Sequence, residues 1–142
     1  MKHLLFITFL AAAALTTHAA DSHDTKPVQG DWKPVTAELG GQPMAEAVLK
    51  TISLKLGDGT YDVLVGDKPD KGTFKVDSST TPMSMDVTGT DGPNQGKTFP
   101  AIYELKGETL RICYDLSGQK RPTEFKTTVG TKLYLVTYHR RK

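Results

Sequence analysis

Side chains that carry catalytic or metal chemistry are few in this sequence and lie far apart. Cys113 is the only cysteine, and beyond the first twenty residues there are two histidines, His23 and His139. A structural zinc site takes four protein ligands and a catalytic one takes three, so these residues make neither. The serines lack the glycine-framed turn of a nucleophile elbow, and no glycine-rich phosphate loop is present. We therefore predict no catalytic residue, no metal and no cofactor.

Cys113 lies inside the apolar run Leu110-Arg111-Ile112-Cys113-Tyr114. A reactive thiol needs a base close by, and the neighbouring sequence offers none. The run therefore favours a small buried thiol that packs like a hydrophobic side chain. With a single cysteine there is no internal disulfide, so the domain depends on its core for stability.

Aromatic residues recur along the chain and are the best candidates for binding. They are Tyr61, Phe74, Phe99, Tyr103, Tyr114, Tyr134 and Tyr138. We select Tyr61, Tyr103 and Tyr114 as candidate ligand-lining residues, because each shares the alternation phase of apolar neighbours on its own predicted strand. A cup lined by tyrosines suits a mostly apolar small ligand held by a few hydrogen bonds. The alternative is that these rings form an ordinary core.

The elements that must position these side chains are short β-type runs separated by turn residues. Eight runs are expected, over residues 31–39, 51–56, 60–65, 71–77, 83–90, 98–105, 109–115 and 132–140. Asp58-Gly59 between two alternating runs is a strong hairpin signal. Pro34 predicts a bulge or an edge position in the first run. The segment 43–50 is the one good helical stretch, about two turns long, and 123–127 is a short extended piece.

Eight strands connected as a meander can close into a barrel, which removes both exposed edges. The predicted fold class is all-β: an eight-stranded antiparallel meander barrel, lipocalin-like, with one short helix after the first strand. A sandwich of two sheets is the alternative, since both folds need the same inward and outward alternation. The loop 90–97 is rich in turn residues and is either a stabilising turn or a recognition loop.

The first residues have the order of a secretory signal. A basic start at Lys2 precedes an apolar run of about a dozen residues, and small residues follow up to Ala19 and Ala20. The run is too short to span a bilayer. We expect a signal peptide over 1–19, a flexible lead-in over 20–28 and the barrel domain over 29–142. The protein would be exported to the periplasm or the exterior, with no membrane span.

Cleavage after Ala19 is preferred, because it puts small residues at both selective positions. Cleavage after Ala20 would start the chain at Asp21-Ser22-His23. A terminal amine, two backbone nitrogens and that histidine form a square-planar set of the kind that Cu(II) and Ni(II) favour. This metal site is the alternative that the preferred cut excludes.

The charge is nearly balanced, at a formal +2 for the whole chain, and charges of both signs are interspersed. No electrostatic footprint for nucleic acid is visible. The basic end, 138–142, is interpreted as a solvated chain terminus. We expect no nucleic-acid partner and a monomeric protein.

Gly30-Asp31-Trp32 on the first strand resembles the Gly-x-Trp signature of lipocalins. In those barrels an arginine of the last strand packs over the tryptophan, and here Arg140 and Arg141 end the last strand. A guanidinium over an indole is a favourable cation–π pair that would tie the first strand to the last.

Most of the chain beyond the signal is also similar to an uncharacterised, planctomycete-type family of small exported lipocalin-like proteins. The matching motifs are QGDW (29–32), GTFKVD (72–77), TDGP (90–93), GKT (96–98), IYEL (102–105), LRICY (110–114) and RPTEF (121–125). The resemblance selects Arg140 as the barrel-closing partner of Gly30 and Trp32. Pro34 and His139 depart from the family pattern. The family resemblance implies the barrel fold and says nothing about chemistry.

Two functions of different class remain open at this point. The first is a carrier or sensor of a small apolar ligand, which predicts a cavity of some hundreds of Å³. The second is a protein-interaction or inhibitor module with a filled barrel, which predicts no ligand cavity. Fold analogy favours the first, and an enzyme is not expected.

Overall fold

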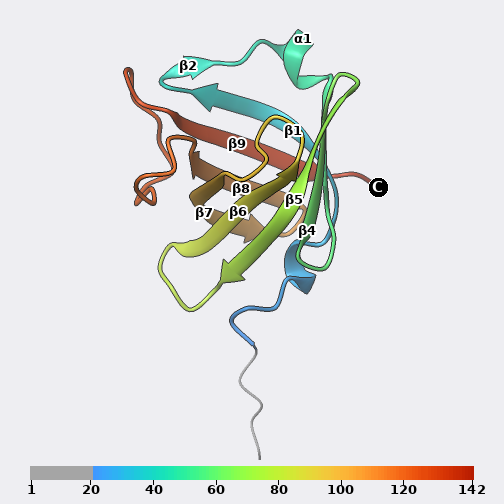
Figure 1. Ribbon diagram of the computed structural model, residues 1–142, viewed down its shortest axis with the longest axis vertical. Coiled ribbons are helices and arrows are strands. Elements are labelled where there is room, and N and C mark those ends of the chain that lie inside the picture. Colours follow the sequence, from blue (N-terminus) through green and yellow to red (C-terminus); the bar gives the residue numbers. More distant parts are fainter. Residues whose placement is uncertain (1–20) are drawn as a thin grey trace, which may run out of the picture.

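The computed structural model describes residues 21–142 (Figure 1). The predicted signal peptide, 1–19, and its cleavage point lie outside the described residues. No helix in the described part is both long enough and apolar enough to cross a membrane.

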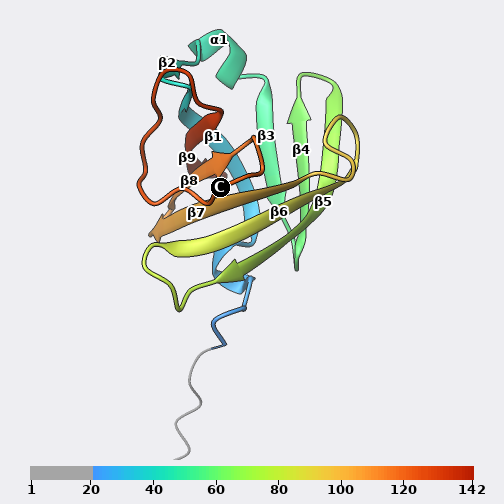
Figure 2. The ribbon, with the colours of Figure 1, turned by 60° about the vertical axis from the view of Figure 1, so that its left-hand side comes forward.

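An antiparallel meander of strands closes on itself to make the molecule (Figures 1 and 2). The strands are β1 (Gly30–Leu39), β2 (Gln42–Pro43), β3 (Ile52–Leu56), β4 (Thr60–Val65), β5 (Lys68–Asp77), β6 (Met83–Asp91), β7 (Thr98–Lys106), β8 (Thr109–Asp115) and β9 (Leu133–Arg140). From β3 onward each strand pairs with the next, and β1 pairs with both β3 and β9. The eight-stranded barrel is therefore confirmed, with β2 as an extra strand on β1.

Alternation of side chains explains why these segments are strands. In β5, Gly72, Phe74 and Val76 are buried while Thr73 and Lys75 are exposed. The same period of two, which a pleated strand imposes, is clear in β3, and the inward apolar residues of the strands form one central cluster.

The predicted bulge and hairpin are both present. The β1–β9 register shifts between Pro34 and Thr36, because proline has no N–H to donate to the ladder. At the tip of the β3–β4 hairpin, the Gly57 N–H donates to the Thr60 carbonyl at 2.8 Å, and Gly59 adopts a φ of 75°. That left-handed conformation is open to glycine at little cost.

The predicted helix over 43–50 begins too early. The observed helix α1 is Glu46–Leu49, and Pro43 belongs to β2, where it pairs with Glu38. The Met44 N–H also donates to the Ala37 carbonyl at 2.8 Å. The edge of β1 thus takes up the backbone that would otherwise have formed the first helical turn.

The lead-in, which we expected to be flexible, makes specific contacts from residue 21 onward. A 3₁₀ turn, η1 (Lys26–Val28), places Val28 inside the barrel with 2% of its surface exposed. The His23 ring nitrogen Nδ1 lies 2.9 Å from the Val76 carbonyl oxygen. This segment covers one end of the barrel, which we call the closed end.

A long loop over residues 116–132 joins β8 to β9 and lies against the outside of the barrel; the extended piece expected at 123–127 is part of it and pairs with no strand. Its anchors are side-chain contacts. Arg121 donates to the Met85 and Ala101 carbonyls at 3.1 and 2.9 Å and to the Asp86 carboxylate at 2.7 Å. The Arg111 guanidinium lies 4.1 Å from the centre of the Phe125 ring.

Candidate functional site

The closed end brings Gly30, Trp32 and Arg140 together. The Arg140 guanidinium lies 4.3 Å from the centre of the Trp32 ring, and it donates to the Pro27 carbonyl at 3.2 Å. A Cβ at Gly30 would lie 2.6 Å from Arg140 Nη1, so glycine leaves the room that the guanidinium needs. These contacts join the first and last barrel strands, which makes the role of the three residues structural.

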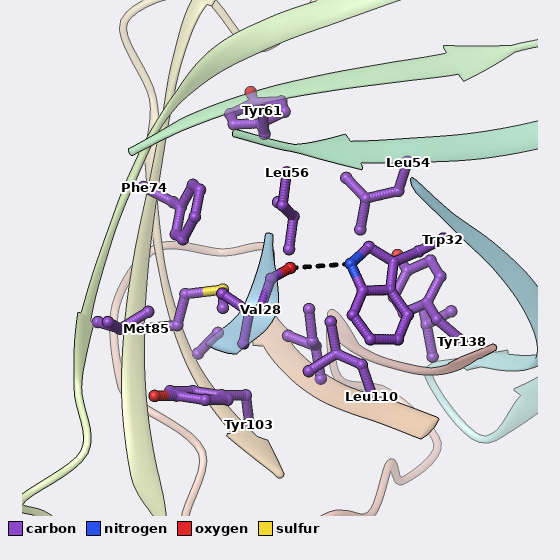
Figure 3. Close-up of a cluster of buried hydrophobic side chains, with 14 of the residues drawn as sticks. Val28, Trp32, Leu54, Leu56, Tyr61, Phe74, Met85, Tyr103, Leu110 and Tyr138 are labelled. Atoms are coloured by element: carbon purple, nitrogen blue, oxygen red, sulfur yellow. Dashed lines mark hydrogen bonds between the residues drawn. The ribbon is translucent and has the colours of Figure 1, made fainter. Parts of the chain in front are cut away.

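Trp32 is fully buried, and its indole N–H donates to the Val28 carbonyl at 2.9 Å (Figure 3). Val28 and Leu110 are buried in the same cluster. Side chains of this cluster therefore occupy the closed half of the interior.

The other half of the interior holds a cavity of about 200 Å³. Its wall is mostly aliphatic and aromatic. The lining residues are Ile52, Leu54, Leu56, Tyr61, Val63, Val65, Asp70, Phe74, Met85, Val87, Asn94, Phe99, Ile112, Tyr114, Leu116, Tyr134 and Tyr138. Such a space, apolar with a few convergent polar groups, is the usual form of a small-molecule site.

Of the candidate lining residues, the structure places Tyr61 and Tyr114 on the cavity wall and Tyr103 away from it. Tyr103 faces the interior too, but it pairs with Met83 at the start of β6, near the closed end. Figure 3 shows Tyr61 and Tyr103 on opposite sides of the buried cluster. Alternation predicts the side of the sheet that a residue faces, whereas its height along the barrel depends on strand register.

Two polar residues of the cavity were missed by the sequence reasoning. Asp70 lay outside the predicted strands, because the run was expected to start at residue 71; β5 starts at Lys68. Asp70 then shares the inward phase of Gly72 and Phe74, which is the signal that would have found it. Asn94 belongs to the loop 90–97, one of whose interpretations was recognition.

The Asp70 carboxylate is held by two neutral donors. The Tyr61 hydroxyl donates to Oδ1 at 3.3 Å, and the Asn94 amide donates to Oδ2 at 2.7 Å. Asn94 reaches Asp70 because its loop folds back over the barrel end, with a bridge between Gly89 and Gln95. The Gly89 N–H also donates to the Lys97 carbonyl at 2.9 Å. The β6–β7 loop is thereby fixed at the cavity.

The tyrosine hydroxyls of the cavity remain protonated at physiological pH. Burial raises the pKa of Tyr61, and the neighbouring Asp70 charge and hydrogen bond raise it further. Burial also raises the pKa of Tyr114, Tyr134 and Tyr138. Desolvation disfavours a phenolate, so these groups act as neutral donors and acceptors. The Tyr114 and Tyr134 rings stack with centroids 5.8 Å apart.

Within residues 21–142, no three histidine, cysteine, aspartate or glutamate side chains gather in a group that could hold a metal ion. Comparison of the chain with protein-family models, with curated proteins and with solved structures finds no match.

Cys113 is fully buried, as its apolar strand pattern predicted. It faces outward from β8 and lies under the 116–132 loop, where its thiol donates to the Lys126 carbonyl at 3.8 Å. Burial raises the pKa of this thiol, which lowers its thiolate fraction.

We expect the folded protein to react with 5,5′-dithiobis(2-nitrobenzoate) at pH 8 about a hundredfold more slowly than the unfolded chain, since the loop must open first. Absorbance at 412 nm, followed with and without guanidinium, measures both rates. Equal rates would mean that the loop does not protect the thiol.

Proposed function

We propose that this protein is an exported, lipocalin-like carrier that binds a small, mostly apolar ligand inside its barrel. The observation that carries the proposal is the cavity of about 200 Å³ with an apolar wall and neutral tyrosine hydroxyls. An engineered apolar cavity of about 150 Å³ already binds benzene. The interaction-module hypothesis required a filled barrel, so the cavity favours the carrier.

The export part of the proposal rests on the sequence order of residues 1–19, and the lipocalin-like part rests on the Gly-x-Trp motif and the meander. The geometry at the closed end supports the second. Trp32 and Arg140, from the first and last barrel strands, stack at 4.3 Å and pair directly in the β1–β9 register. A cation–π contact in this position ties the two strands that complete the barrel.

Native mass spectrometry of the protein from its own compartment tests both the bound ligand and the export signal. We expect a stoichiometric small mass that disappears on organic extraction, on a chain that starts at Ala20. A bare protein mass, with no shift against a panel of lipids and metabolites, would contradict the carrier proposal. The same spectrum reports the mature N-terminus, because each residue retained adds its own mass.

A pair of neighbouring variants places the ligand. Val63→Phe adds a phenyl ring to the cavity wall, whereas Leu64→Phe adds the same ring to the next residue of β4, which is 44% exposed. We expect Val63→Phe to lose the bound mass and Leu64→Phe to retain it. If both variants retain the bound mass, the ligand lies outside the barrel.

A further inference from the structure

The cavity has an unbalanced charge. Among the described residues, 21–142, Asp70 is the one acidic residue on its wall, and no lysine, arginine or histidine lines it. Asp70 also forms no ion pair with any residue of the described chain. The space therefore presents a single carboxylate at one edge of an apolar surface.

The partners of that carboxylate leave part of its hydrogen-bonding capacity free. It accepts one bond from Tyr61 and one from Asn94, whereas an ionised carboxylate has about four acceptor positions. Both existing donors are neutral, so neither cancels the charge. A cationic donor is the group that would complete this site, because charge-assisted hydrogen bonds are the strongest that a carboxylate makes.

The aromatic wall favours the same kind of ligand. Tyr61 touches Asp70, and the stacked rings of Tyr114 and Tyr134 line the same cavity. The faces of such rings attract cations through their quadrupoles. An anionic ligand would meet the Asp70 charge with no positive side chain on the wall to offset it.

We propose that the ligand is a small protonated amine with an apolar body, whose ammonium group pairs with Asp70. This inference rests on the carrier function proposed above and specifies the chemistry of its ligand. The volume of about 200 Å³ suits one aromatic ring with a short aminoalkyl chain. The ring lies among the aliphatic side chains deeper in the barrel, and the ammonium lies at the end where Asn94 and the β6–β7 loop hold the carboxylate.

Isothermal titration with three compounds of similar shape tests the proposal: 2-phenylethylamine, 2-phenylethanol and 3-phenylpropionate. We expect the full-length mature protein to bind the amine at least about tenfold more tightly than the alcohol, as a close charge pair allows. The carboxylate should bind more weakly than either. The Asp70→Asn variant should lose the preference for the amine and keep its affinity for the alcohol within about twofold.

Asp67→Asn is the matched control, because it removes the same charge from an exposed residue three positions away. It should behave as the unmodified protein. Equal affinity for amine and alcohol, or a preference for the carboxylate, would overturn the amine inference and leave the carrier function standing. Absence of binding by all three compounds, together with a bare native mass, would overturn both. The comparison on the unmodified protein decides the matter even if Asp70→Asn does not fold.

Discussion

Replacement of Trp32 by alanine is expected to lower the free energy of unfolding by about 4 kcal/mol. The side chain is fully buried and lies between the Val28 carbonyl, which accepts its N–H at 2.9 Å, and the Arg140 guanidinium. Its removal leaves a cavity and an unpaired buried carbonyl. Since domains of this size are stable by about 5–15 kcal/mol, this loss is a large fraction of the total stability. Urea unfolding followed by far-ultraviolet circular dichroism measures the change. Tryptophan fluorescence cannot be used, because Trp32 is the only tryptophan and the variant lacks it.

Two companion variants separate the contributions. Trp32→Phe keeps much of the packing and loses the hydrogen bond, so we expect a smaller loss of about 2 kcal/mol. Val35→Ala changes a residue of the same strand that is 48% exposed and should cost less than about 0.5 kcal/mol. A loss below 1 kcal/mol for Trp32→Ala would show that the closed end does not hold the barrel together.

The order of strands could be read from the sequence because it is encoded locally. Each hairpin has its own turn signal, and Asp58-Gly59 is the clearest. Closure of the barrel could also be predicted, since it depends on a tryptophan and an arginine near the two ends of the domain sequence. The structure places Trp32 opposite Arg140 in the register that joins β1 to β9.

The cavity was harder to predict, because alternation carries no information on depth. Tyr103 and Tyr114 both face inward on their strands, yet only Tyr114 lines the cavity. Depth depends on where each strand begins, and strand ends are the least certain part of a sequence-based assignment. The start of β5 was predicted at residue 71, whereas the strand begins at Lys68. Asp70 was missed for this reason.

Under the proposed function, stability and ligand binding are divided between the two ends of one barrel. The closed end contains Trp32, Val28 and Leu110, which are buried in one hydrophobic cluster. The other end has the cavity, the Asp70 carboxylate and the loop that carries Asn94. Substitutions at the closed end should therefore act on folding, whereas those around Asp70 should act on the choice of ligand. This separation makes the ligand experiments interpretable.

Asp115→Asn is expected to lower the free energy of unfolding at pH 7 by about 2 kcal/mol. Asp115 is 6% exposed, and its carboxylate accepts hydrogen bonds from the Ser117 hydroxyl at 2.6 Å and from the backbone N–H groups of Ser117, Gln119 and Lys120. An amide offers one acceptor oxygen and turns a donor toward N–H groups that need an acceptor. Urea titration of both proteins gives the difference, and Asp91→Asn, at an exposed position, is the control.

The pH dependence of that difference identifies its cause. Burial by itself would raise the pKa of the Asp115 carboxyl, but the hydrogen bonds from Ser117, Lys120 and Gln119 together hold it below its usual value. A carboxyl of this kind adds stability above its unfolded pKa, about 3.9, and loses that contribution as the pH falls through the lower folded value. The two proteins should therefore differ fully above about pH 5 and converge in acid. A difference that persists in acid would assign the loss to packing.

Asp115 also organises the start of the loop that covers Cys113. If its hydrogen bonds hold that loop down, Asp115→Asn should speed the reaction of Cys113 with the disulfide reagent at denaturant concentrations where the barrel is still folded. Faster labelling at denaturant concentrations where circular dichroism shows both proteins still folded would show that the loop opens as a separate unit. Unchanged labelling would show that Arg121, through its contacts with Met85, Ala101 and Asp86, is sufficient to keep the loop closed.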